Sequence, residues 1–110
     1  MAGWYELGKG TDGQFRFNLK AGNAEIILTS EGYTTRASAQ NGIASVQANC
    51  GLDERYAREV AADGRPYFNL KGANHQIIGT SQLYKSEAAR DGGIASVKAN
   101  GATTTVKESD

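Results

Sequence analysis

The sequence predicts an α+β fold made of two copies of a β-β-β-α unit. The expected architecture is an antiparallel sheet with two helices packed on one face and a pseudo-twofold axis between the copies. Residues 12–50 align without a gap on residues 63–101, and 20 of these 39 positions are identical. In each copy, segments of alternating apolar and polar residues precede a segment with helical periodicity. One unit has too few strands and residues to bury its sheet alone, so the copies should share a core.

Three strands joined by tight turns are expected at the start of each copy. In residues 14–21 the apolar side chains fall on one face, and Arg16, Asn18 and Lys20 fall on the other. This alternation is typical of a strand that buries one face. An Asp-Gly pair precedes this segment in both copies, and glycine adopts the positive φ of a hairpin turn without a steric penalty. The other strands are expected at residues 4–10, 25–29, 65–71 and 76–80.

Helices are expected at residues 36–49 and 87–100, with Thr35 and Ser86 as matching N-caps. The apolar stripe of the first helix has the spacing i, i+4, i+7 and i+11. Its members are Ala39, Ile43, Val46 and Cys50.

Both expected helices contain an interior glycine, Gly42 or Gly93, at matching positions. Each costs about 1 kcal/mol relative to alanine. We expect close packing, with a neighbouring backbone that leaves no room for a Cβ atom, and the alternative is a helix broken at this point.

Two bulky residues are exchanged with glycine in opposite directions between the copies. Leu28 corresponds to Gly79, and Gly32 corresponds to Leu83. The exchange indicates complementary packing in a shared core and predicts that Leu28 and Leu83 occupy related space.

The domain organisation expected is one domain, residues 1–110, with repeats at 1–51 and 52–110. The joint at residues 51–54 is too short for a flexible linker. Residues 103–106 are β-prone and are expected either to add a short edge strand or to fray, and residues 107–110 form a tail.

Composition and charge argue against several classes of protein. There are 12 basic and 12 acidic residues, so the basic excess of many nucleic-acid-binding proteins is absent. The apolar runs are too short to span a bilayer, and no signal-peptide pattern precedes the first strand. We therefore expect a cytoplasmic protein that does not bind membranes.

No candidate catalytic or metal centre emerges from the sequence. Cys50 is the only cysteine and is expected to be buried or inert. His75, the only histidine, lies beside a turn, and Asp12 and Asp63 are explained by turn geometry. We predict no cofactor, no metal and no enzymatic activity.

The motif set resembles the YegP-like family of small bacterial and archaeal proteins. In both copies an Asp-Gly pair precedes Phe-Asn-Leu-Lys-x-x-Asn, then Ile-Ile-x-Thr-Ser, Tyr and Gly-Ile-Ala-Ser-Val-x-Ala-Asn. The resemblance covers nearly the whole chain. It implies tandem β-β-β-α units, with single-copy members expected to dimerise into the same shape. It implies no known activity and no catalytic residues.

Two surfaces remain as candidates for function. The first is the polar face of the second strands, which is basic, amide-rich and carries an aromatic residue if these strands lie side by side. Such a face could bind single-stranded nucleic acid, although a half-exposed sheet needs polar residues in any case. Its members are Arg16, Asn18, Lys20, Tyr67, Asn69 and Lys71.

The second surface involves Tyr33 and Tyr84, which follow the third strands. Each is expected to pack over the start of a helix; if partly exposed, the pair would give two symmetric aromatic sites. Open strand edges could also accept a partner strand. By elimination we favour a non-catalytic protein- or peptide-interaction module whose partner is unknown. We expect a monomer that acts as a covalent pseudo-dimer.

Overall fold

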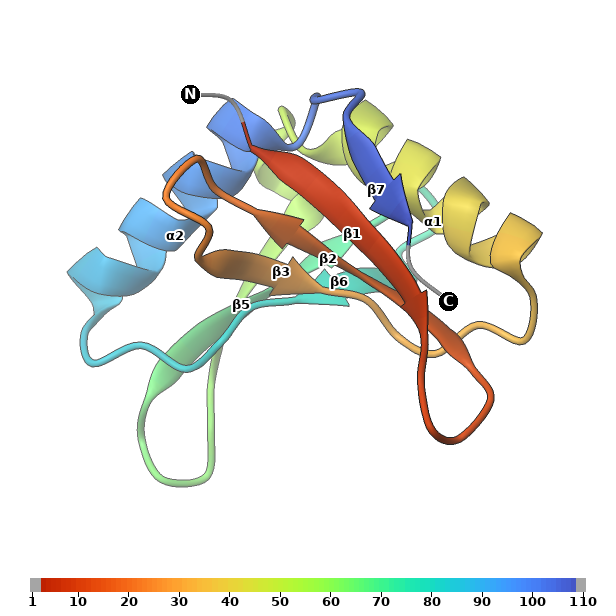
Figure 1. Ribbon diagram of the computed structural model, residues 1–110. Helices are drawn as coiled ribbons and strands as arrows, with labels where there is room; N and C mark the ends of the chain where they lie inside the picture. The colour runs from red at the N-terminus through yellow and green to blue at the C-terminus, as the bar shows by residue number, and fades with distance from the viewer. Residues whose placement is uncertain (1–2, 109–110) are drawn as a thin grey trace.

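Two β-β-β-α units follow each other along the chain and lie around a pseudo-twofold axis (Figure 1). The computed structural model describes residues 3–108. The first unit contains β1 (Trp4–Lys9), β2 (Phe15–Lys20), β3 (Ile26–Thr29) and α1 (Arg36–Asn49). A short 3-10 helix, η1 (Asp53–Arg55), leads to β4 (Tyr56–Val60), β5 (Pro66–Lys71), β6 (Ile77–Thr80), α2 (Glu87–Asn100) and β7 (Val106–Glu108).

All seven strands form one sheet in the order β4-β5-β6-β3-β2-β1-β7. The two units meet where β3 pairs antiparallel with β6, and Thr29 lies opposite its repeat equivalent Thr80. The six strands of the two units pair antiparallel, as the alternation predicted. An edge strand is present, but it lies at residues 106–108 rather than 103–106 and pairs parallel with β1. The sheet is therefore mixed. Of the predicted tail at 107–110, residues 109 and 110 lie outside the described residues.

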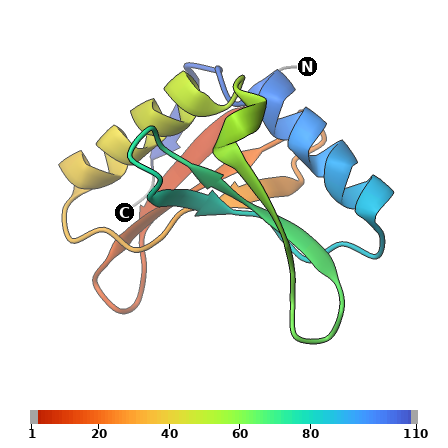
Figure 2. The same ribbon diagram turned by 180° about the vertical axis from the view of Figure 1, so that it is seen from behind.

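Both helices cover the same face of the sheet, and the hairpins β1–β2 and β4–β5 extend away from them (Figures 1 and 2). Helix α1 contacts β5 and β6 of the second unit as well as β2, and α2 contacts β2 and β3 of the first unit as well as β5. Each helix thus packs on strands from both units. The buried side chains form one apolar cluster that includes Phe17, Leu19, Phe68 and Leu70.

The interior glycines lie under tyrosine rings in helices that are unbroken. A Cβ atom built on Gly42 would lie 2.5 Å from the Tyr33 hydroxyl, and one on Gly93 would be closer still to the Tyr84 hydroxyl. Close packing is therefore confirmed as the reason for these glycines. The expectation of a neighbouring backbone is wrong, because the atoms closest to both positions belong to the tyrosine side chain.

The exchange of bulk across the axis is confirmed for one pair and wrong for the other. A Cβ atom on Gly79 would lie 2.7 Å from Leu28, so the missing side chain makes room for the leucine of the other unit. Leu83, in contrast, is 41% exposed, whereas Leu28 is fully buried. These two leucines do not occupy related space, because Leu83 lies in the loop after β6 and points to solvent.

Candidate functional site

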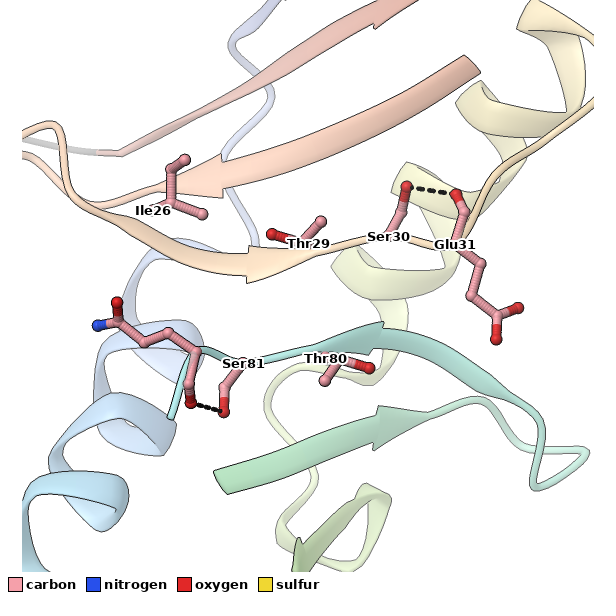
Figure 3. Close-up of a pocket in the computed structure, with 7 residues that line it drawn as sticks. Ile26, Thr29, Ser30, Glu31, Thr80 and Ser81 are labelled. Atoms are coloured by element: carbon pink, nitrogen blue, oxygen red, sulfur yellow. Dashed lines mark hydrogen bonds between the residues drawn. The ribbon is translucent and has the colours of Figure 1, made fainter. Parts of the chain in front are cut away.

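The sheet face away from the helices carries a shallow groove at the pseudo-twofold axis (Figure 3). Its volume is about 470 Å³, and its walls come from the ends of β3 and β6 and the residues after them. Matching Thr-Ser pairs line it from both units. Ser30 accepts from the amide of Phe17 at 2.9 Å and donates to the carbonyl of Glu31 at 2.8 Å. Ser81 repeats both bonds, so the identical serines fix the chain where it leaves the sheet.

A polar row crosses the centre of this face. Thr29 donates to the Asn18 carboxamide oxygen at 3.0 Å, and Thr80 donates to that of Asn69 at 2.8 Å. Neither carboxamide nitrogen has a hydrogen-bond partner within residues 3–108. Two carboxamide NH2 groups therefore flank the axis, and these asparagines belong to the surface that the sequence singled out.

The predicted basic face is divided and largely neutralised. Strands β2 and β5 do not lie side by side, because β3 and β6 separate them. Arg16 pairs with Asp12 at 2.9 Å and Lys20 pairs with Glu6 at 3.1 Å. Hydrogen bonds from Arg16 lower the pKa of Asp12 to about 2.

On the second unit, the remaining members of that surface lie on β5. Tyr67 and Asn69 pair with Glu59 and Ala57 of β4, and Lys71 pairs with Ile77 of β6. Within the described chain Lys71 has no ion pair. The six residues thus share a face but form two separate groups.

Tyr33 and Tyr84 are partly buried and pack against the core. Their rings stack on Phe17 and Phe68 with centroids 6.3 Å apart in both units. Burial raises the pKa of both phenols. They lie over the middle of each helix, at the interior glycines, and not over its start.

Sequence reasoning missed a pair of buried tyrosines that link the units. Tyr5 in β1 donates to the carbonyl of Gly101 at 2.6 Å, and Tyr56 in β4 donates to the carbonyl of Cys50 at the same distance. Each phenol therefore donates a hydrogen bond to a carbonyl at the C-terminal end of the other unit's helix. Burial raises the pKa of both phenols well above 10.0. The signal was available, since Tyr5 and Tyr56 are also 51 positions apart.

The residues considered for chemistry are dispersed. Cys50 is buried, and burial raises the pKa of its thiol, which disfavours the reactive thiolate. His75 lies in an exposed turn with φ of 66°. In residues 3–108 no three His, Cys, Asp or Glu side chains gather as a metal site would require. No helix in that range has the length and apolar character needed to cross a bilayer.

Strand β7 covers the outer edge of β1. Tyr5 lies opposite Val106 and Leu7 opposite Glu108, in parallel register. The amide of Tyr5 donates to the carbonyl of Thr105 at 2.9 Å. Strand β1 is therefore paired on both sides, and β7 forms this edge of the sheet.

Three side chains of α1 hold this segment in place. Arg36 and Gln40 donate to the carboxylate of Glu108, and Gln47 donates to the carbonyl of Thr103 at 2.8 Å. The added strand is thus bonded to β1 by its backbone and to α1 by its side chains.

Strand β4 is the repeat equivalent of β1, but nothing within the described residues pairs with its outer edge. In Figure 2 it lies at the front of the sheet. The amide of Ala61 donates to the carbonyl of Arg65 across the hairpin, so alternate amides of the strand face β5. The backbone groups of Arg58 and Val60 consequently face outward.

Charged side chains lie between this open edge and α2. Arg58 lies 3.3 Å from Asp91 and 3.7 Å from Asp53, and Lys98 pairs with Asp53 at 2.8 Å. Arg90 also pairs with Asp91, at 3.2 Å. Partial burial acts to raise the pKa of Asp91, but the two arginines hold it below its usual range. In the first unit the position of Arg58 is taken by the buried Leu7.

Comparison with known proteins gives consistent matches over both units. The sequence model of a domain of unknown function (DUF1508) matches residues 11–56 and again residues 61–108. A UPF0339 protein of Shewanella oneidensis is 64% identical over 98% of both chains, and UPF0339 protein YegP of Escherichia coli K12 is 61% identical over 98% of both.

Two solution NMR structures have the same fold. That of the Shewanella oneidensis UPF0339 protein superposes with a TM-score of 0.92 and 64% identity, covering 98% of this chain and 92% of that one. That of the Escherichia coli yegP protein, described as of unknown function, gives a TM-score of 0.93 and 61% identity, covering 98% and 93%.

Proposed function

The chain belongs to the DUF1508 family of YegP-like proteins, and we propose that it is a non-catalytic module that binds an extended peptide segment along β4. One observation carries the proposal. The outer edge of β1 is completed by β7, whereas the equivalent edge of β4 is unpaired within residues 3–108. The pairing of β7 with β1 therefore shows, within this chain, the kind of strand addition that a partner could make at β4.

The exposed groups of β4 support strand addition. Extended peptides bind open sheet edges through main-chain hydrogen bonds, and side-chain contacts then select the sequence. The amide of Tyr56 is already bonded to Asp53 in η1, so the available groups begin at the carbonyl of Tyr56 and continue through Arg58 to Val60. Val60 is 63% exposed and offers an apolar contact at the end of the strand.

We also propose that the protein has no enzymatic activity and that it acts in the cytoplasm. Support for a non-catalytic role comes from the buried thiol and from the positions of His75, Asp12 and Asp63, which do not gather with it into one site. A lone unpaired cysteine also suits a reducing compartment.

A pair of variants of one residue tests the proposal. Arg58→Pro removes an outward amide and leaves the β4–β5 ladder intact, because proline is tolerated at an edge position that faces solvent. Arg58→Ala removes the same side chain but keeps the amide. Peptides selected from a random library on the natural chain should bind Arg58→Ala and lose binding to Arg58→Pro. Selected peptides that bind all three proteins equally would contradict binding at this edge, and circular dichroism controls for the fold.

A second candidate, binding of single-stranded nucleic acid to the open sheet face, rests on the unpaired carboxamide nitrogens of Asn18 and Asn69. The ion pairs of Arg16 and Lys20 weaken it, since they reduce the positive charge available to phosphates. Titration with mixed single-stranded RNA and DNA at low salt should move the β2 and β5 amides if this function is real. Unchanged amide signals would remove it.

A further inference from the structure

Building on the proposed peptide site, we propose that the β4 partner runs parallel to β4 and carries lysine or arginine beside Arg58, where β7 carries Glu108 beside Leu7. The first unit supplies the geometry for this inference, and the residues of the second unit supply the chemistry. Equivalent residues of the two units are 51 positions apart in the sequence.

The first unit shows which side chains an added strand meets. Glu108 lies opposite Leu7, and its carboxylate accepts hydrogen bonds from Arg36 and Gln40 of α1. A strand added to β4 in the same register would place one side chain opposite Arg58. That side chain would reach the two helix positions equivalent to Arg36 and Gln40.

The charge of those two positions is inverted in the second unit. Arg36 is replaced by Glu87 and Gln40 by Asp91, so an arginine and an amide become two carboxylates. Glu87 lies in the first turn of α2, is exposed, and has no ion pair within residues 3–108. A basic side chain on the partner would neutralise this carboxylate, whereas an acidic one would be repelled by it.

Five other charged groups around the edge are paired with one another. Arg58 and Arg90 share Asp91, and Lys98 is bonded to Asp53. Arg58 also lies near Asp53, which pairs with Lys98 toward the C-terminal end of α2. Glu87 lies one helical turn from Asp91 in the other direction, toward the N-terminal end of α2. Among these groups, the Glu87 carboxylate is the one that has no ion pair within residues 3–108, so it is the group that a cation from a partner would neutralise.

The same inversion discriminates against the chain's own C-terminal segment. If β7 of a second copy added to β4, Glu108 would meet Glu87 and Asp91. Such head-to-tail addition would also leave further open edges and could extend without closure. The unpaired carboxylate of Glu87 thus favours a basic partner and opposes self-association.

Two peptides and one double variant test this inference. The probes are TTTVKE, the sequence of residues 103–108, and its charge-swapped form TTTVEK. Amide signals of β4 are followed by NMR during titration of the full chain with each peptide. TTTVEK should bind about threefold to tenfold more tightly, with the difference shrinking at high salt. In Glu87→Arg/Asp91→Gln, which carries the residues of the first unit, the preference should reverse.

Each outcome separates the two proposals. If both peptides perturb β4 equally and the double variant changes nothing, the edge binds strands without reading charge, and this inference fails while the proposed function stands. If TTTVKE binds better to the natural chain, the inference is overturned directly. If neither peptide perturbs β4 at millimolar concentration, both proposals are contradicted. Cross-strand NOEs between β4 and β5 that are retained in the unbound double variant show that its edge is intact, because loss of the Arg58–Asp91 pair alone will shift some β4 signals.

Discussion

Residues that are identical in the two units mostly serve contacts inside the fold. Asn49 and Asn100 each donate to a helix carbonyl one turn back, at 2.8 Å. Their carboxamide oxygens accept from Arg55 and from the amide of Gly3, which lead into the first strands. Sequence identity between repeats therefore reflects structure more often than a binding site.

Neighbouring glycines of α2 provide a matched pair of substitutions. Gly93→Ala should destabilise the protein, because the new Cβ would collide with the Tyr84 hydroxyl. Gly92→Ala should stabilise it by up to about 1 kcal/mol, since a Cβ there meets nothing within 4 Å and alanine favours the helix. Urea unfolding of the two variants measures the difference. Stabilisation by both would mean that Tyr84 does not pack on this helix.

The buried tyrosines that link the units should control stability at alkaline pH. Tyr56→Phe and Tyr5→Phe should each lower the free energy of unfolding by about 1–2 kcal/mol, because a buried carbonyl loses its donor. The folded phenols have raised pKa values, so the natural chain is stabilised below pH 10 and loses this contribution as pH rises further.

The double variant Tyr5→Phe/Tyr56→Phe should consequently lose less stability than the natural chain between pH 9 and about pH 11. Urea unfolding of both proteins at each pH provides the measurement. Equal losses would show that these phenols ionise as readily in the folded state as in the unfolded one.

At the scale of elements, β7 is the strand that makes the two units different. It covers β1, where Tyr5 and Leu7 are almost fully buried, while β4 in the other unit ends the sheet. Deleting residues 106–110 should therefore destabilise the chain and speed hydrogen exchange at the Leu7 amide, which faces β7. The amide of Arg58 should exchange quickly in both proteins. A slow Arg58 amide in the full chain would mean that the β4 edge is already covered.

The helices and five of the first six strands could be predicted because each has a local signal, whereas β4 was expected only from the repeat. Thr35 and Ser86 cap helices of the predicted length, and alternation placed Phe17 and Leu19 in the core. The strand order could not be predicted, since nothing local says that β3 and β6 occupy the centre. For the same reason the division of the basic face and the open β4 edge were visible only in three dimensions.

At the scale of the whole molecule, the two units are complementary rather than equivalent. Leu28 fills the space beside Gly79, and a Cβ atom on Gly101 would lie 2.7 Å from Cys50. Fragments 1–51 and 52–110 should therefore be unfolded or weakly folded alone and should form a 1:1 complex when mixed. Analytical ultracentrifugation and circular dichroism of the separate and mixed fragments check this. Stable folded monomers of either fragment would contradict a shared core.

The pairing of Leu28 with Gly79 also limits how the halves can recombine. Two copies of the first half would bring two leucines into space that holds one, together with a second Cys50 where Gly101 now lies. Two copies of the second half would leave a void at both places, and a void costs stability. Neither half therefore retains a self-complementary interface, so neither should form the homodimer that a single-copy relative could form.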